Sequence, residues 1–254
     1  IVKKKIIIAV NSTFNLINHR VGLINGLLDG GYEVVAISPT DEFASRVKEL
    51  DCHHVPLQME RKGTNIARDL LLFWRYRTVL RQYMPDIYLG FTVKPNIYGS
   101  LAAQSLGIPV INNISGLGTV FGAMRTSLVG NLLSRLLRAL YWFALLRSDR
   151  IFFQNKDDRR EFIEQGVVKA HLTDLLPGSG VDLDRFAYNP ITVNKLAPKT
   201  KNEKKKTRFL LVARMLWDKG VGEYVEAARL LSRRYPRTEF CMIGFLDFQN
   251  PEAI

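Results

Sequence analysis

The sequence predicts an α/β protein built on parallel sheets, with one large domain followed by the beginning of a second. Three observations support this fold class. Short apolar runs alternate with helical patterns along the chain, Gly and Pro residues end several of the helices, and a Lys- and Pro-rich segment interrupts the alternation near residue 190. Buried strands that are separated by helices favour a parallel sheet covered on both faces.

The first part of the chain contains six apolar runs with the length and composition of buried strands. They are residues 6–10, 33–38, 87–91, 110–114, 150–154 and 171–176. Helices are expected between and after them at 18–28, 41–50, 65–83, 97–106, 128–146 and 157–165. His53 and His54 are expected on an edge strand as surface or packing residues.

A domain boundary is predicted where Pro190, Pro198 and a cluster of lysines break this alternation. Residues 1–189 then form a Rossmann-like N-terminal domain, 190–206 a solvated linker, and 207–254 an incomplete C-terminal domain. The last part contains a new βα unit, with strands at 208–213 and 239–244 and a helix at 220–234. Both ends of the sequence look like cuts rather than natural termini.

The composition is that of a globular protein, with 47% hydrophobic and 24% charged residues and a formal net charge of +12. Such a charge suits nucleic acid, an anionic membrane or phosphorylated substrates. Cys52 and Cys241 lie far apart and have no metal-ligand spacing, which fits a reducing compartment. No signal peptide is evident, and Arg135 and Arg138 interrupt the longest apolar stretch, which argues against a spanning helix.

The loop after the first strand is a natural site wall, because open α/β sheets bind ligands beyond the carboxyl ends of their strands. Asn11, Ser12 and Asn15 are the candidate residues there. The loop has no glycine, so the dinucleotide-binding fingerprint is absent, and this disfavours a nicotinamide or flavin enzyme. A Walker phosphate loop and a nucleophile elbow are absent as well.

The start of the second domain contains candidate phosphate ligands. Arg214 follows a predicted strand, and Lys219 and Gly220 open the next helix. Two cations beside a helix N-terminus can bind a diphosphate and offset its charge as it departs. The alternative is that Arg214 and Lys219 are two ordinary surface cations in a loop.

A second motif precedes the linker: Gly178, Gly180, Val181 and Asp182, with Phe186 four residues further on. Together with the Arg214–Lys219–Gly220 spacing, it resembles the family 4 glycosyltransferases of the GT-B fold. The resemblance implies that Gly178, Gly180, Asp182 and Gly220 bind the nucleotide-sugar donor, and that Arg214 and Lys219 stabilise the departing diphosphate as the catalytic cations.

Further loops, at 61–65, 91–100 and 113–119, are similar to those of a bacterial branch of this family. Its members build capsule, O-antigen or lipid-linked oligosaccharides on polyprenyl-diphosphate carriers. The resemblance implies a UDP-sugar donor, a lipid-linked saccharide acceptor and a place at the cytoplasmic face of the plasma membrane. Residues expected to line the cleft, besides Asn11, Ser12 and Asn15, are Lys94, Asn96, Ser115, Gly116 and Gly118.

Two departures from the family limit the assignment. The glutamate pair that contacts the donor in relatives is not found, and its expected place lies beyond Ile254. Because this pair is absent and the second sheet is incomplete, we expect this chain alone to bind its donor weakly and to turn over poorly. Ser115 stands where many relatives carry a histidine, so no side-chain base is assigned. The family's usual proposal, front-face attack assisted by the leaving phosphate, tolerates that change. Asp182 and Asp184 spell a metal-binding D-x-D, but they lie inside the interdomain motif, so neither a metal nor another cofactor is expected.

Two helices combine arginines and aromatic residues in a way that suits an anionic membrane surface. In the first, Ile66, Leu70, Phe73 and Leu80 have core spacing, which leaves Leu71 and Leu72 on the outer face. The residues expected to contact the membrane are Arg68, Trp74 and Arg75 on this helix and Arg135, Arg138 and Trp142 on the helix at 128–146. Core helices with a solvated basic face would have the same pattern.

Alternative functions remain open at this point. A non-catalytic basic α/β module could bind membrane or nucleic acid, although no helix-turn-helix or RNP motif supports the nucleic-acid version. A GT-B sugar epimerase or phosphorylase is a third possibility. We favour a retaining hexosyltransferase, for a hexose or N-acetylhexosamine, with no nucleic-acid partner.

Overall fold

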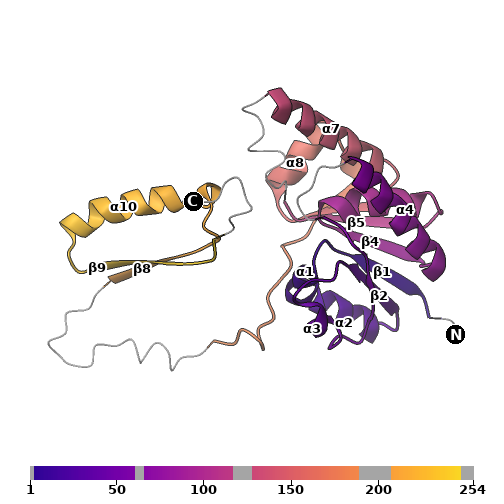
Figure 1. Ribbon diagram of the computed structural model, residues 1–254, viewed down its shortest axis with the longest axis horizontal. Coiled ribbons are helices and arrows are strands. Elements are labelled where there is room, and N and C mark those ends of the chain that lie inside the picture. Colours follow the sequence, from indigo (N-terminus) through magenta and orange to yellow (C-terminus); the bar gives the residue numbers. More distant parts are fainter. Residues whose placement is uncertain (1–2, 61–65, 117–127, 189–206, 247–254) are drawn as a thin grey trace. The chain divides into compact units, whose positions relative to one another are not determined.

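The computed structural model describes residues 3–60, 66–116, 128–188 and 207–246 (Figure 1). The chain forms two compact units, Ile1–Phe186 and Ala187–Ile254, and each is described by itself. The predicted linker, 190–206, lies outside the described residues. The first unit contains a seven-stranded parallel sheet and the second a two-stranded one, so the predicted α/β class is confirmed.

The sheet of the first unit has the order β3-β2-β1-β4-β5-β6-β7, and every neighbouring pair is parallel. In register, Ile7 of β1 lies opposite Val35 of β2 and Tyr88 of β4. The strand order changes direction between β1 and β4, and this is the place where open α/β sheets bind ligands. The strands are β1 (Lys5–Ala9), β2 (Glu33–Ser38), β3 (His53–Pro56), β4 (Ile87–Phe91), β5 (Val110–Ile114), β6 (Arg150–Phe153) and β7 (Thr173–Leu175).

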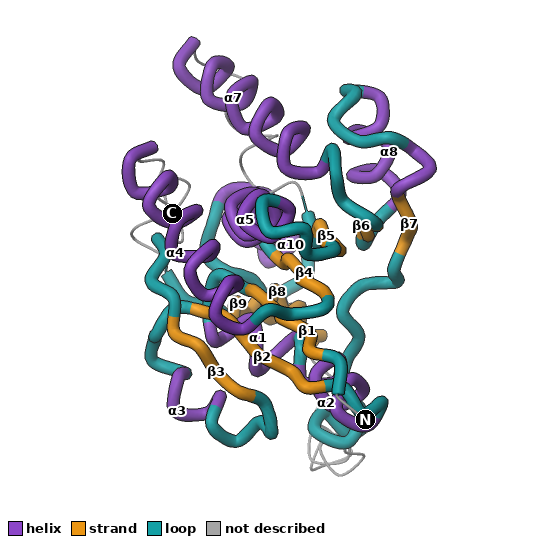
Figure 2. Tube along the Cα trace, turned by 90° about the vertical axis from the view of Figure 1, so that its right-hand side faces the viewer, coloured by secondary structure: helices purple, strands orange, loops and turns teal. Residues whose placement is uncertain are grey.

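Helices cover both faces of this sheet (Figures 1 and 2). Side chains alternate along each strand, so Ile8 packs against α1, α2 and α3 while Ile7 packs against α4 and α5. A third cluster joins β5 and β6 to α7 and α8. The helices are α1 (Thr13–His19), α2 (Val21–Asp29), α3 (Ala44–Val47), α4 (Ile66–Tyr83), the π-helical turn η1 (Pro95–Gly99), α5 (Ser100–Gln104), α7 (Leu128–Leu145), α8 (Lys156–Glu164) and η3 (Ala170–Leu172).

The helix predicted at 18–28 is in fact two helices, and the break lies at Arg20. Ser12 begins α1 by accepting a hydrogen bond from the backbone N–H of Asn15. Arg20 has φ −124° and ψ −3°, which is not helical, and it separates α1 from α2. Periodicity could not show this break, because apolar residues continue at helical spacing on both sides of it.

The buried face of helix α4 agrees with the predicted one only in part: Leu80 is buried and Phe73 packs against the core, as expected. Leu70, expected in the core, is 60% exposed, whereas Leu72, expected outside, is 2% exposed and packs with Tyr76 and Leu80. The buried face also includes Asp69. A charged residue therefore occupies a core position, which the hydrophobic pattern alone could not indicate.

The second unit is a single βα unit followed by a further strand. Its elements are β8 (Thr207–Val212), η4 (Trp217–Lys219), α10 (Val221–Arg234) and β9 (Thr238–Ile243). The two strands pair in parallel, and Phe209 stacks on Phe240 across them. The hydroxyl of Tyr224 donates to the carbonyls of Phe209 and Cys241, at 3.1 and 2.9 Å, and ties α10 to both strands.

Candidate active site

A small cavity lies at the carboxyl ends of β1, β4 and β5, beside the switch point of the sheet. Its volume is about 190 Å³. Five predicted cleft residues come together in its lining: Asn11 after β1, Lys94 and Asn96 after β4, and Ser115 and Gly116 after β5. They lie far apart in the sequence and meet because parallel strands end at the same edge of the sheet.

The other three predicted cleft residues do not line this cavity. The buried hydroxyl of Ser12 caps α1 instead. Asn15 lies in the first turn of α1, and its buried Oδ1 has no hydrogen-bond partner. Gly118 lies outside the described residues. Ser12 is therefore structural, and Asn15 keeps one unused acceptor near the sheet edge.

Asn96 forms the floor of the cavity, and its amide is engaged within the protein. Its Nδ2 donates to the carbonyl of Asn113 at 2.9 Å, and its Oδ1 accepts from Nδ2 of Asn112 at 2.9 Å. Asn112 in turn donates to Ser100 and accepts from Ser148, both at 2.7 Å. A fully paired buried network of this kind holds its members in one arrangement. Asn96 therefore shapes the cavity rather than offering a free amide to a ligand.

Two glycines make room for this arrangement. A Cβ at Gly90 of β4 would lie 2.7 Å from Oδ1 of Asn96. At Gly99, in the π-helical turn, a Cβ would lie 1.8 Å from the hydroxyl oxygen of Tyr88. That hydroxyl is fully buried and donates to the carbonyl of Pro95 at 2.9 Å. Hence the loop after β4 folds as it does only because both positions lack a side chain.

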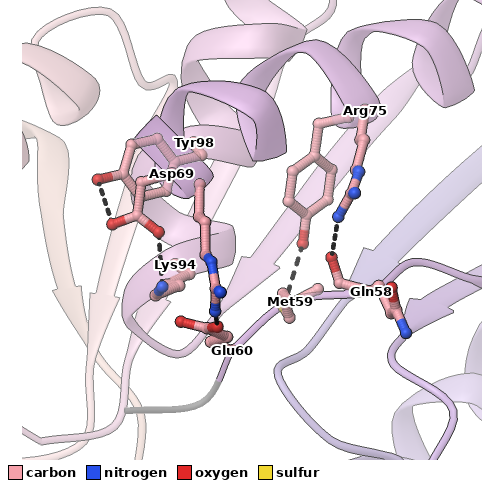
Figure 3. A network of polar contacts seen from close by, with 9 residues as sticks. Gln58, Met59, Glu60, Asp69, Arg75, Lys94 and Tyr98 are labelled. Carbon is pink, nitrogen blue, oxygen red and sulfur yellow. Dashed lines mark hydrogen bonds and ion pairs between the residues drawn. The ribbon is translucent and has the colours of Figure 1, made fainter. Parts of the chain in front are cut away.

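Lys94 is held by a buried acid that the sequence did not reveal as part of the site. Its Nζ lies 2.5 Å from Oδ1 of Asp69, the acidic residue in the first turn of α4. The hydroxyl of Tyr98 donates to Oδ2 of the same carboxylate at 3.1 Å (Figure 3). Burial, with the charge of Asp69 adding to it, raises the pKa of Tyr98, so its hydroxyl stays a proton donor. Both oxygens of Asp69 are thus occupied, and Lys94 is fixed at the edge of the cavity.

Lys94 also lines a second, larger cavity of about 510 Å³ between α4 and the loops that follow β2 and β3. Arg68 pairs with Glu60 at its mouth, and Arg75 donates to the carbonyl of Gln58 at 3.1 Å (Figure 3). Two of the predicted membrane-contact residues, Arg68 and Arg75, therefore have partners that hold them beside this cavity. The complete lining is Pro39, Thr40, Gln58, Met59, Glu60, Arg68, Asp69, Leu71, Leu72, Arg75 and Lys94.

The predicted donor motif before the linker forms an exposed loop with two left-handed glycines, Gly178 at φ 92° and Gly180 at φ 74°. Oδ1 of Asp182 accepts from the backbone N–H groups of Asp184 and Arg185, at 3.0 and 2.9 Å. Asp182 therefore closes a turn with its carboxylate. In the described part of the chain, no three His, Cys, Asp or Glu residues gather as metal ligands would.

In the second unit, Arg214 follows β8, and Lys219 ends η4, two residues before α10 begins at Val221. Gly220 connects η4 to α10 with φ 74°, a conformation that favours glycine. Lys219 Nζ lies 3.0 Å from Asp218 in an exposed pair, which stabilises the fold very little. Since Gly220 has no side chain to cap α10, the N–H groups of its first turn can receive an anion.

The remaining predicted membrane-contact residues lie on two helix surfaces of the first unit. Trp74 is exposed on α4 beside Leu70 and Leu71. On α7, Arg135 and Trp142 are exposed, and Arg138 donates to the hydroxyl of Ser134 at 3.0 Å. Phe143 and Leu146 add exposed apolar surface at the end of this helix. Among the described helices, none has the length and apolar character needed to cross a membrane.

Comparison with known proteins assigns a family. The family model described as "Glycosyl transferase 4-like domain" matches residues 18–178, more than half of the chain. A relative from Campylobacter jejuni, N,N'-diacetylbacillosaminyl-diphospho-undecaprenol alpha-1,3-N-acetylgalactosaminyltransferase, is 27% identical over 242 residues. That match covers 94% of this chain and 62% of the relative.

Solved structures share the fold at low sequence identity. A glycosyltransferase from Rickettsia africae superposes with a TM-score of 0.63 at 16% identity, over 95% of this chain and 60% of its own. Anabaena Alr3699/HepE in complex with UDP and glucose gives 0.66 at 14% identity, over 95% and 61%. S. aureus MnaA with UDP gives 0.60 at 15% identity, over 98% and 64%. This chain thus spans about three fifths of the length of these relatives.

Proposed function

This chain belongs to the glycosyl transferase 4-like family, and we propose that it is part of a retaining enzyme that moves a hexose or N-acetylhexosamine from a UDP sugar to a polyprenyl-diphosphate-linked saccharide. The observation that carries the proposal is the convergence of Asn11, Lys94, Asn96, Ser115 and Gly116 on one cavity at the switch point of the sheet. The choice of a lipid-linked acceptor follows the name of the Campylobacter relative.

In the proposed reaction, an acceptor hydroxyl forms a bond to the anomeric carbon while the bond from that carbon to the UDP phosphate oxygen breaks on the same face. The acceptor's proton passes to the departing phosphate. Arg214, Lys219 and the N-terminus of α10 offset the negative charge that develops on the diphosphate. Fixed positive groups of this kind make a metal ion unnecessary in the step.

The first unit would hold the acceptor. Lys94, fixed by Asp69, lies at the edge of both cavities and can donate hydrogen bonds to sugar hydroxyls or to an anionic group. The exposed apolar and aromatic residues of α4 and α7, with their arginines, would rest on the cytoplasmic surface of the membrane that carries the acceptor. Such contact raises the local concentration of a lipid-linked substrate.

The test is calorimetric binding of UDP, with GDP and ADP as comparisons, followed by transfer from labelled UDP sugars to a polyprenyl-diphosphate-linked monosaccharide. We expect selective UDP binding that Arg214→Ala/Lys219→Ala weakens by about 100-fold. Arg233→Ala/Arg234→Ala removes the same charge at the other end of α10 and serves as the control. Unchanged UDP affinity in the first pair would refute the role given to Arg214 and Lys219.

Product analysis separates this proposal from the alternatives. Extended lipid-linked glycan supports a transferase, free UDP-linked epimer an epimerase, and sugar phosphate a phosphorylase. Vesicle sedimentation tests the membrane contact, because Trp74→Ala/Trp142→Ala should reduce binding to anionic vesicles and leave UDP binding unchanged. Equal sedimentation of the variant and the parent protein would remove α4 and α7 from the proposal.

A further inference from the structure

Arg20, between α1 and α2, is a buried cation that has no acidic partner among the described residues. It is 5% exposed, and none of the ion pairs between described residues includes it. Its Nε is buried and has no hydrogen-bond partner. Burial lowers the pKa of the guanidinium to about 10, so the group still carries its charge at neutral pH. A buried, uncompensated charge costs free energy, so other contacts must hold it in place.

Those contacts lead to the loop that leaves the first unit. The guanidinium carbon lies 4.1 Å from the ring centroid of Phe91, the last residue of β4, in a cation–π arrangement. Nη1 donates to the carbonyl of His19 at 3.3 Å and to Oγ of Ser179 at 3.1 Å. The side chain of Arg20 therefore connects the end of a central strand, at Phe91, to Ser179. Ser179 lies 159 positions from Arg20 in the sequence.

Ser179 is the anchor of that loop. It stands between Gly178 and Gly180, both at positive φ, so the backbone on either side has little intrinsic preference for one conformation. Its hydroxyl receives a second hydrogen bond, from Nε2 of Gln154 after β6, at 3.1 Å. Two donors, one from the junction of α1 and α2 and one from the loop after β6, thus meet on one exposed hydroxyl and select one conformation of the two glycines.

Beyond Ser179, the segment is exposed and lightly held. Val181, Leu183 and Phe186 are largely exposed, and the first unit ends at Phe186. Arg185 provides another link, from Nη2 to Oδ1 of Asn18, at 3.2 Å. Arg20 is thus the buried residue among the few side chains whose hydrogen bonds hold the last segment of the first unit in place.

We propose that Arg20 is a positioning residue that holds the Gly178–Asp182 loop, through Ser179, in the conformation that receives the donor. This inference rests on the proposed function and on the expectation, implied by the resemblance of this motif to the family, that Gly178, Gly180 and Asp182 bind the nucleotide sugar. An arginine suits the position because its planar guanidinium stacks on Phe91 while its N–H groups donate in the plane. A lysine can make one of these contacts well, but not both.

Hydrogen–deuterium exchange tests whether Arg20 holds the loop, without any assumption about activity. In Arg20→Met and Ser179→Ala, we expect the hydrogen-bonded amides on either side of Ser179, those of Leu176, Asp184, Arg185 and Phe186, to exchange about 10-fold faster, while those of β1 and β4 keep their protection. Arg46→Met makes the same chemical change on an exposed side chain of α3 and should alter nothing. Unchanged exchange at these four amides in both variants would overturn the proposal.

Kinetics test the consequence for the donor. Ser179→Ala should lower kcat/KM for the UDP sugar by about 10-fold and Arg20→Met by more, while KM for the lipid-linked acceptor stays within about twofold. Arg20→Lys should recover only part of the loss. An equal loss for donor and acceptor, or full recovery with lysine, would mean that Arg20 is a packing residue only and would contradict the proposal.

The two tests also distinguish a failure of the proposed function from a failure of the role given to Arg20. Should the full-length protein neither bind UDP nor transfer sugar, the proposed function fails, and exchange at the amides of Leu176, Asp184, Arg185 and Phe186 still decides whether Arg20 holds the loop. Should Arg20→Met fail to fold, Ser179→Ala decides the matter, because it changes one exposed side chain and leaves the buried cation in place.

Discussion

Strands β1 and β8 have similar apolar sequences and opposite surroundings. In β1, Ile7 and Ile8 are completely buried, because the strand lies between β2 and β4 with helices on both faces. In β8, Val212 is 69% exposed; among the described residues the strand pairs only with β9, and the hydroxyl of Tyr224 in α10 donates to the carbonyl of Phe209. An apolar strand becomes core only where other elements cover it on both sides.

The candidate site residues differ in the same way. Those of the first unit are held by buried contacts, such as the Lys94–Asp69 pair and the amide network around Asn96. Lys219, in contrast, pairs with an exposed neighbour on a small, open βα unit. We therefore expect substitutions around the first cavity to change stability and activity together. Substitutions at Arg214 and Lys219 should change donor binding with little effect on folding.

The largest effect on stability is expected at Gly99. A methyl group there would overlap the buried hydroxyl of Tyr88, so Gly99→Ala should destabilise the first unit by about 3 kcal/mol or more. The control is Gly26→Ala in α2, where a Cβ meets nothing within 4 Å, and a gain of about 0.5–1 kcal/mol is expected. Urea unfolding measures both. Equal stability of the two variants would show that the loop after β4 can rearrange freely.

Asp69→Asn should have the next largest effect. It leaves the largely buried ammonium of Lys94 without its carboxylate, at a cost of about 2–3 kcal/mol, and it should also raise KM for the acceptor. Asp157→Asn, in the exposed pair with Arg160, provides a matched change with an expected cost below about 0.5 kcal/mol. Similar costs for both variants would mean that the burial of Asp69 does not matter.

A smaller effect is expected from Tyr224→Phe in the second unit. The change removes hydrogen bonds to the carbonyls of Phe209 and Cys241, and a loss of about 1 kcal/mol should follow. Amide exchange in β8 and β9 would measure the loss. Tyr235→Phe, on an exposed ring, is the control. If exchange in the two strands does not change, Tyr224 does not hold them to α10.

The smallest effect is expected at Leu230 of α10, which is 72% exposed. Leu230→Gln should change stability by less than about 0.5 kcal/mol, whereas Leu80→Ala on the buried face of α4 should cost about 2–5 kcal/mol. Urea unfolding again measures both variants. A cost above about 1.5 kcal/mol for Leu230→Gln would contradict the contrast drawn between the two units, because it would show that this face of α10 is covered in the protein.

Much of the fold and part of the candidate site could be predicted from local patterns. The strands at 33–38, 87–91 and 110–114 have the predicted bounds, since short apolar runs between helices have few alternatives in an α/β chain. Asn11, Lys94 and Ser115 could be placed at one edge of the sheet for the same reason. Asp69 and Arg20 were missed, because a lone acid or arginine inside a helical pattern normally indicates a solvated face.

The sequence by itself determined that this protein is α/β, that its strands are parallel, and which loops meet at their carboxyl ends. These properties follow from hydrophobic period and from the handedness of strand–helix–strand connections, both of which are local. Only the tertiary structure decided that α4 buries Asp69 and exposes Leu70, and that Arg20 interrupts a helix to reach Ser179. A buried charge is stable only beside a particular partner, and residues distant in the sequence supply that partner.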